Sequence, residues 1–300
     1  MQLTDESAFQ EFIHYITFQK RYSQHTIISY KNDLIAFFNF LSGHYNYVPL
    51  SEISPAMIRS WLASLKEQGI TSKSINRKIS TLKSFFKYKL KLGRIEVNPM
   101  FSVSSLKVNK RLPSFIEQKD MHTLFHYFEF PGTWEGRTER LLMMIFYQTG
   151  MRLSELIQIR EAHIDNSNRT IKVLGKGNKE RIIPVHAELI NEIYEYSKAK
   201  KDLEDESSED FLLITKKGKK LYPKYVYNVA KKYLGSVSTN ERKSPHVLRH
   251  TFATHLTNNG ADINAVKELL GHASLASTQI YTHNSIEKLK EIYKLAHPKS

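Results

Sequence analysis

The chain has 300 residues, of which 41% are hydrophobic and 25% are charged, and this is the composition of a folded globular protein. It contains no cysteine, which excludes disulfide bonds, thiolate metal sites and a cysteine nucleophile. The sequence has no apolar run of membrane-spanning length and no apolar signal core near Met1, so we expect a cytoplasmic protein with no membrane partner.

The formal net charge of +14 at pH 7 makes the chain strongly basic. Basic residues outnumber acidic ones in residues 1–105 and also in the remainder. Such a surplus favours a polyanionic partner, whereas membrane-surface binding usually concentrates the charge on one amphipathic helix. We therefore expect a nucleic acid that both parts of the chain contact, with solubility alone as the simpler alternative.

Residues 1–105 are expected to be helical. Apolar residues recur there at three- and four-residue spacing, which predicts helices with one buried stripe each. Serine caps, a proline at a first helical position and stopping glycines indicate where these helices begin and end. The predicted helices cover residues 24–41 behind Ser23, residues 54–69 with Ser54 as cap and Pro55 first, and residues 71–93.

The third of these helices has an apolar stripe that ends in Leu90, and its other faces carry lysines and arginines, Lys89 among them, without acids of their own. Such a surface is most often a solvated helix side, but here the lack of balancing acids favours contact with the DNA backbone. A second basic cluster lies in residues 106–112, which we interpret as a linker between two domains. The expected contacts with the DNA backbone are Lys73, Arg77 and Lys83 on the helix, and Lys107, Lys110 and Arg111 in the linker.

The remaining residues mix helices with a few strands. An apolar helix is expected up to Gly150, and a new helix directly after it. Two β-branched runs, Thr170–Val173 and Arg181–Val185, flank the glycine-rich turn "GKGNK" and predict a hairpin. Residues 211–215 are a candidate for one more short strand, and the chain from residue 222 onward is expected to be helical.

Six side chains in this second part are suited to attack on a phosphodiester without a metal. Phosphoryl transfer spreads negative charge over the non-bridging oxygens, so its catalysis is largely positioning and charge stabilisation. Guanidinium groups match phosphate oxygens, lysine or histidine can pass a proton to the leaving alkoxide, and tyrosine is a nucleophile where cations favour its anion. The candidates are Arg152, Lys176, His246, Arg249, His272 and Tyr281.

Each candidate also has an ordinary explanation. An arginine at a helix start is more often a surface ion-pair partner, and Tyr281 is one of 16 tyrosines. A zinc site at His246, His250 and His255 is the competing chemical interpretation, but their spacing lacks the glutamate of H-E-x-x-H. We therefore expect no metal and no other cofactor.

Four segments resemble, in order and spacing, the signature segments of the tyrosine recombinase (phage integrase) family. They are "TGMRLSELIQI", "GKGNKERIIPV", "SPHVLRHTFATHL" and "LLGHASLASTQIYTH". The segment "YSQHTIISYKNDLIAFFNFL" is similar to the first DNA-binding helix of this family, so the resemblance covers the whole chain. The length and the ending "YKLAHPKS" look most like the Xer-type site-specific recombinases, which resolve chromosome dimers at cell division.

The resemblance implies a role for each candidate residue. Tyr281 would be the nucleophile that forms a 3′-phosphotyrosine link to DNA. Arg152 and Arg249 would hold the scissile phosphate, His246 would assist proton transfer there, and Lys176 would protonate the leaving 5′-oxygen.

The other two implied residues support this group. His272 would contact the phosphate, and Glu155 would orient the cluster without touching the phosphate itself. Residues 138–150 would form a buried helix beneath the site. No catalytic position departs from the family pattern, so the resemblance implies an active enzyme.

The implied fold is mainly α-helical. Residues 1–105 would be an N-terminal, SAM-like helical domain that binds core DNA, and residues 106–112 the basic linker. Residues 113–300 would be a mostly helical catalytic domain with a small antiparallel sheet or hairpin. The two domains would clamp double-stranded DNA between them.

The resemblance also implies an assembly. Four protomers would join two recombination sites and exchange strands through a Holliday junction, as a homotetramer or as a heterotetramer with a second Xer-type recombinase. A division-associated DNA translocase is a further implied partner. The last helix would dock on the neighbouring protomer, with packing on its own domain as the alternative, through an apolar stripe of Ile286, Leu289, Ile292, Tyr293 and Leu295.

Three other functions remain open at this point. The chain could be the integrase or excisionase of a mobile element, a monomeric topoisomerase of the type IB kind, or a basic DNA-binding regulator without chemistry. The sequence predicts neither the DNA target nor the choice between one recombinase and a pair.

Overall fold

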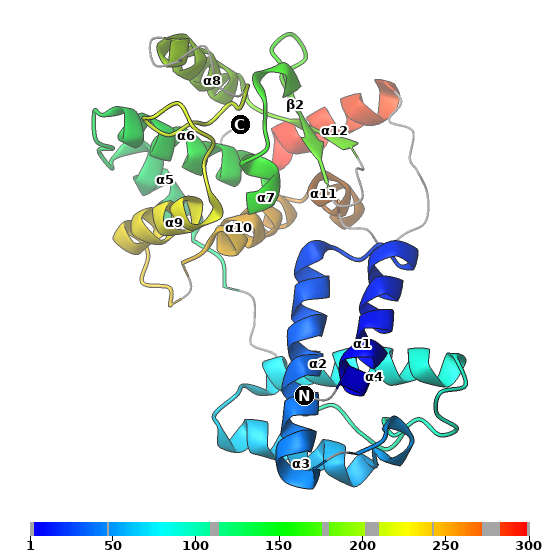
Figure 1. The fold of residues 1–300 in the computed structure, drawn as a ribbon. Coiled ribbons are helices and arrows are strands. Elements are labelled where there is room, and N and C mark those ends of the chain that lie inside the picture. The colour runs from blue at the N-terminus through cyan, green and yellow to red at the C-terminus, as the bar shows by residue number, and fades with distance from the viewer. Residues whose placement is uncertain are drawn as a thin grey trace. The chain divides into compact units, whose positions relative to one another are not determined.

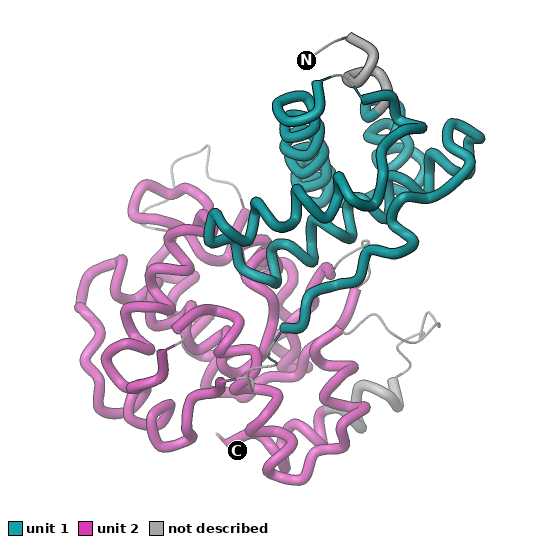
Figure 2. Tube along the Cα trace, turned by 90° about the horizontal axis from the view of Figure 1, so that it is seen from below, with its two compact units in different colours: residues 1–111 teal, residues 112–300 magenta. Residues whose placement is uncertain are grey.

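The computed structural model describes residues 3–46, 48–108, 114–175, 180–201, 210–241, 243–271 and 283–298. The chain divides into two compact units, residues 1–111 and residues 112–300, which Figure 2 draws in teal and magenta. Each unit has a hydrophobic core of its own and is described by itself. The division falls within the expected linker, residues 106–112, and the exact extent of that linker stays a prediction.

The first unit is helical, as the spacing of its apolar residues predicts. Figure 1 shows its elements in blue to cyan: α1 (Leu3–His14), the π-helical turn η1 (Tyr15–Gln19), α2 (Gln24–Tyr45), the 3-10 turn η2 (Leu50–Glu52), α3 (Pro55–Glu67) and α4 (Ser72–Lys91). The hydroxyls of Ser23 and Ser54 accept the backbone N–H groups of Thr26 and Met57, so both expected caps are confirmed. Aromatic side chains fill the core, and Trp61 is among the largest that are fully buried.

The last turns of α4 differ from the prediction. Leu90, expected in the buried stripe, is 39% exposed, whereas Lys89, expected on the basic surface, is 2% exposed. The stripe continues from Phe86 by a step of three residues rather than four, so Lys89 faces the core. Its Nζ lies 2.6 Å from the carboxylate of Glu11, and this hydrogen bond is the main cause of the lowered pKa of Glu11.

The second unit is mostly helical with a small sheet. Its elements in chain order are α5 (Gln118–His126), α6 (Trp134–Thr149), α7 (Leu153–Leu156), the 3-10 turn η3 (Glu161–His163), β1 (Ile164–Asp165), β2 (Thr170–Leu174), β3 (Glu180–Pro184), α8 (Ala187–Lys200), α9 (Pro223–Val237), α10 (Pro245–Asn258), α11 (Ile263–Leu270) and α12 (His283–Ala296). This is the fold class that we expected. None of the described helices is both long and apolar enough to cross a membrane.

The expected hairpin is confirmed. Strands β2 and β3 pair antiparallel, with Thr170 opposite Pro184 and Val173 opposite Arg181. Strand β1 adds to the other edge of β2, so the strands of the described residues form a sheet in the order β1-β2-β3. The turn between β2 and β3, residues 176–179, lies outside the described residues.

The prediction of a further strand at residues 211–215 was wrong. Single bridges pair Phe211 with Arg160 and Ile214 with Lys220, and no longer ladder forms over this described segment. Its apolar side chains are buried in the core instead. A short apolar run is typical of a strand and of irregular core backbone alike, so its composition does not separate the two.

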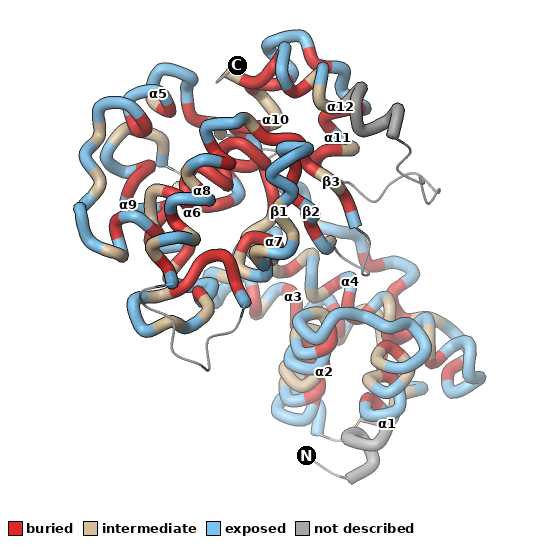
Figure 3. Tube along the Cα trace, turned by 90° about the horizontal axis from the view of Figure 1, so that it is seen from above, coloured by how far each residue is buried: buried red, intermediate tan, exposed pale blue. Residues whose placement is uncertain are grey.

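Helix α6 runs through the core of the second unit. Its residues from Leu141 to Thr149 are all buried, and Figure 3 draws this part of the helix in red. Helices α8, α9 and α10 contact it. The buried helix expected at residues 138–150 is therefore present, and it carries the turn that leads to the first candidate arginine.

Helix α12 packs on its own unit, against α10, α11 and β3. The Tyr293 hydroxyl is buried and donates a 2.8 Å hydrogen bond to the carbonyl oxygen of Gln148. Leu295, assigned to the apolar stripe, is 82% exposed, and the side chains of Ile286 and Leu289 lie outside the described residues. The single chain thus has the arrangement weighed as the alternative, and docking on a neighbouring protomer stays a prediction for the assembly.

Candidate active site

The junction between α6 and α7 places Arg152. Helix α6 ends at Gly150, whose φ of +56° lies in the left-handed region. A Cβ at this position would lie 2.4 Å from Cδ1 of Phe252, so both the backbone conformation and the available space require glycine. Arg152 follows as the N-cap of α7, and its side chain is 34% exposed.

Replacing Gly150 with alanine is expected to lower the free energy of unfolding by about 3 kcal/mol, since strain in the left-handed region and overpacking against Phe252 add. Urea denaturation measures this loss. Gly260→Ala is the matched control, because Gly260 also has a positive φ, +90°, but nothing lies within 4 Å of its added Cβ. Equal losses in the two variants would contradict the packing argument.

Glu155, three residues after Arg152 in the sequence, fixes the position of Arg152. Its carboxylate accepts the backbone N–H of Arg152 at 2.7 Å and Nη1 of the same residue at 2.8 Å. Burial raises the pKa of Glu155, but the hydrogen bonds and charge of Arg181, together with the hydrogen bonds from Arg152, outweigh burial and bring the pKa below its usual value. Glu155 is therefore a carboxylate at neutral pH and serves two arginines.

Arg249 reaches the same place from the second turn of α10. Its Nη1 donates to the carbonyl oxygen of Gly150 at 2.7 Å and its Nη2 to that of Leu270 at 2.6 Å. Burial, followed by the charges of Arg152 and Arg181, lowers the pKa of Arg249 to about 10. The guanidinium thus remains protonated at neutral pH, in surroundings with surplus positive charge.

A third arginine, Arg181, is a member of the cluster that the sequence did not single out. Its Nη1 and Nη2 donate to the two carboxylate oxygens of Glu155 at 3.0 and 2.8 Å, and its Nε donates to the carbonyl oxygen of Leu269 at 2.8 Å. A signal was present in the strand pattern. Arg181 and Ile183 are two residues apart and both face the buried side of β3. A charged residue in an inward position needs a buried partner.

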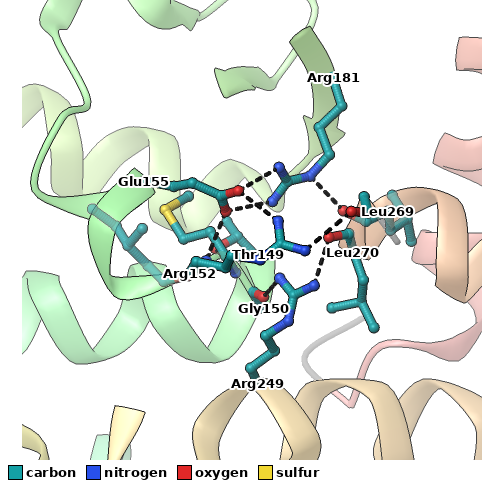
Figure 4. A network of polar contacts seen from close by, with 11 residues as sticks. Thr149, Gly150, Arg152, Glu155, Arg181, Arg249, Leu269 and Leu270 are labelled. Atoms are coloured by element: carbon teal, nitrogen blue, oxygen red, sulfur yellow. Dashed lines mark hydrogen bonds and ion pairs between the residues drawn. The ribbon is translucent and has the colours of Figure 1, made fainter. Parts of the chain in front are cut away.

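The end of α11 is the point where the three arginines meet, as Figure 4 shows for Leu269 and Leu270. The carbonyls of Leu269, Leu270 and Gly271 accept from Arg181, Arg249 and Arg152 respectively. Helix C-terminal carbonyls have no partner within the helix and carry the negative end of its dipole, so they suit cationic donors. Three guanidinium groups and one carboxylate give this arginine cluster a net positive charge suited to an anion.

The histidines of α10 separate into two environments. His246 is exposed in the first turn of the helix, three residues before Arg249. His255 is buried, with its Nδ1 3.2 Å from the hydroxyl of Tyr147 and its Nε2 2.9 Å from the carbonyl oxygen of Ile116. Because both ring nitrogens of His255 hold protein partners, the geometry does not favour the zinc interpretation.

Three of the predicted catalytic residues, Lys176, His272 and Tyr281, lie outside the described residues. The described chain leads directly to two of them: α11 ends at Leu270, its C-cap Gly271 precedes His272, and α12 begins at His283, two residues after Tyr281. The structure therefore brings Arg152, Glu155 and Arg249 together at the end of α11, and the positions of the other three stay predictions.

The predicted DNA-backbone residues of the first unit have mixed surroundings. Lys73, Lys83 and Lys107 are exposed, whereas Lys110 and Arg111 lie outside the described residues. Some cations of α4 have a balancing acid on another helix, and this corrects the basis of the prediction for Arg77. Asp33 of α2, 1% exposed, accepts Arg77, and it also accepts Nζ of Lys78 and the hydroxyl of Thr81, both at 2.9 Å.

Replacing Asp33 with asparagine is expected to lower the free energy of unfolding by about 2 kcal/mol. The loss should lie below the roughly 3–5 kcal/mol typical of broken buried pairs, because Arg77 remains 46% exposed. Chemical denaturation of the variant measures this loss. Glu67→Gln, an exposed position of α3, should stay within about 0.5 kcal/mol of the parent, and a similarly small change at Asp33 would refute its assigned importance.

Two family models match the chain. Residues 114–288 match the phage integrase family, and residues 9–93 match the N-terminal SAM-like domain of phage integrases. The two matches lie one in each compact unit.

Curated relatives cover nearly the full length. The tyrosine recombinase XerC of Thermodesulfovibrio yellowstonii is 37% identical, over 96% of this chain and 95% of its own. The XerC of Listeria innocua is 36% identical, over 99% of this chain and 100% of its own. The XerC of Chlorobaculum parvum is 33% identical, over 96% of this chain and 94% of its own.

Solved structures have the same fold. XerH site-specific recombinase bound to palindromic difH substrate, in a post-cleavage complex, aligns with a TM-score of 0.71 and 26% identity, over 88% of this chain and 78% of that chain. A lambda integrase (75-356) dimer bound to a COC' core site aligns with a TM-score of 0.70 over 93% of this chain and 100% of that chain. At 19% identity the second likeness concerns the fold alone.

Proposed function

Because the chain belongs to the tyrosine recombinase (phage integrase) family, we propose that the arginine cluster at the end of α11 is its active site for DNA strand exchange. The protein is a site-specific recombinase, similar to XerC, that breaks and rejoins DNA. The finer role that we propose is the resolution of chromosome or plasmid dimers at cell division.

One observation supports this site above the others. Arg152 and Arg249 come from α7 and α10, far apart in the sequence, and both donate to the last carbonyls of α11. Directly beyond these carbonyls, the chain continues into the segment that holds His272 and Tyr281. The cluster therefore joins two phosphate-binding groups to the backbone that carries the proposed nucleophile.

The proposed chemistry requires only side chains of the protein. Tyr281 gives its hydroxyl proton to His246 and its oxygen attacks the scissile phosphorus, the bond to the 5′-oxygen breaks, and Lys176 gives that oxygen a proton. Arg152 and Arg249 stabilise the charge on the non-bridging oxygens, with His246 and His272 as further donors. The phosphotyrosine diester conserves the bond energy, so a 5′-hydroxyl from a second duplex can attack it and restore the DNA backbone.

The proposed partners follow from the solved complexes. XerH is bound to a difH substrate in its structure, and lambda integrase is a dimer on a core site. We infer that this protein binds double-stranded DNA through both of its units and joins two sites as a tetramer. Lys73, Lys83, Lys107 and the other predicted cations would contact the phosphates, and a second recombinase of the same kind would complete the tetramer in a paired system.

A Holliday junction tests this function against its alternative. The DNA site is first selected from a random duplex pool by binding to the protein, and a synthetic junction is built from it. We expect the protein to resolve the junction into duplexes and to leave a supercoiled plasmid without the site unrelaxed. Ready relaxation of that plasmid, with an intact junction, would instead indicate a topoisomerase of the type IB kind.

A further inference from the structure

Arg181 stands at an unusual place for a buried cation. It lies in β3 opposite Val173 of β2, so it belongs to the hairpin whose turn carries Lys176. It is 4% exposed, and within the described residues its side-chain hydrogen bonds go to Glu155 and to the end of α11. The side chain of Arg181 therefore links the hairpin to the carboxylate of Glu155 in α7 and to the helix that precedes the proposed nucleophile.

Stability alone does not explain this choice of residue. Burying a charged pair carries a desolvation cost, and apolar residues of similar volume often stabilise a core as well or better. Arg181 is also packed tightly, since a Cβ on Gly271 would lie 3.1 Å from its Cδ. The position thus maintains a buried guanidinium that leaves little room for a side chain at Gly271.

The charges explain what the third arginine contributes. Without Arg181, Glu155 and Arg152 would form a pair with no net charge, and the carboxylate would compete with a phosphate for Arg152. With Arg181 donating to both carboxylate oxygens, Glu155 is neutralised and still orients Arg152 through its backbone N–H and Nη1. The positive charge of Arg152 is then not cancelled by Glu155 and remains available to attract an incoming anion.

We propose that Arg181 is a positioning residue for strand cleavage, which neutralises Glu155 and fixes the end of α11 so that Arg152 is presented to the scissile phosphate. This inference rests on the proposed function of the cluster. Arg181 does not touch the phosphate in this account, so its contribution to the rate passes through Glu155 and α11.

The test compares cleavage with binding and folding. Wild type, Arg181→Met and Arg181→Lys are measured for affinity to the selected duplex, for single-turnover cleavage of a nicked form of that duplex, and for Tm. We expect Arg181→Met to cleave about 10- to 100-fold more slowly, as is typical when a residue that orients a binding group is lost, with an affinity within about threefold of wild type. Arg181→Lys should recover part of the rate, because it restores the charge without the fork.

Lys200→Met is the matched control for loss of a buried cation. Lys200 is 1% exposed, and its Nζ lies 2.8 Å from Glu161 and 2.8 Å from the carbonyl oxygen of Phe211, neither of which belongs to the arginine cluster. This variant should lose stability as Arg181→Met does, yet cleave at the wild-type rate while folded. Equal rate losses in the two variants would reduce Arg181 to a structural residue.

A double-mutant cycle with Glu155→Gln completes the test. Because Arg181 is proposed to act largely through the charge of Glu155, Arg181→Met should slow the Glu155→Gln enzyme by much less than it slows wild type. Effects that simply multiply would overturn the inference, as would a wild-type rate in folded Arg181→Met. Absence of cleavage by the wild type would instead refute the proposed function itself.

Discussion

Replacing Tyr281 with phenylalanine is expected to abolish covalent capture of DNA and to leave DNA affinity within about twofold of wild type. No other candidate side chain is proposed to form the ester, so the rate should fall by at least about 10⁴-fold, as when a catalytic nucleophile is removed. A nicked duplex carrying the selected site measures this, because the cleaved end diffuses away and the covalent complex accumulates.

The control for this variant is another tyrosine. Tyr194 of α8 is 60% exposed, and Tyr194→Phe should form the covalent complex at the wild-type rate. Capture of DNA by Tyr281→Phe at a rate near that of Tyr194→Phe would show that a different group attacks the phosphorus.

Replacing Arg249 with alanine is expected to slow cleavage by about 10²- to 10³-fold, the range found when one preorganised donor to a developing oxyanion is removed. Arg249 is 9% exposed and donates to Gly150 and Leu270, so the variant also leaves two carbonyl oxygens without their donor. Each of these costs about 1–3 kcal/mol where water does not replace the donor. The cleavage rate is therefore compared at a temperature at which circular dichroism shows both proteins folded.

The conservative variant Arg249→Lys separates charge from geometry. Lysine keeps the positive charge, but it cannot donate to two carbonyls and a phosphate in the fixed fork of a guanidinium. We expect its rate to lie between those of alanine and wild type. A wild-type rate for folded Arg249→Ala would contradict the assignment of this arginine to the scissile phosphate.

Most of the helical fold could be predicted from the sequence, because local rules dominate there. Capping by Ser23 and Ser54 and the left-handed stop at Gly150 depend on neighbours within one helical turn. The errors arose where tertiary contacts decide the outcome. Lys89 is buried with its Nζ bonded to Glu11 of α1, and no periodicity within α4 contains that information.

The candidate site was predictable in part for a similar reason. The order of the motifs identified Arg152, Glu155 and Arg249, and the structure brings these three together at the end of α11. The sequence did not show that three successive carbonyls receive one arginine each, since this depends on where α11 ends in space. The hairpin pattern does not single out Arg181, because its inward position in β3 does not reveal which buried partner its charge has.

The covalent link is the central claim, and its position can be measured directly. The trapped complex is digested with protease and nuclease, and the peptide that retains a nucleotide is identified by mass spectrometry. The account predicts one modified peptide, joined at Tyr281 to the 3′-phosphate of the cleaved strand. Attachment at any other residue, or linkage through a 5′-phosphate, would contradict it.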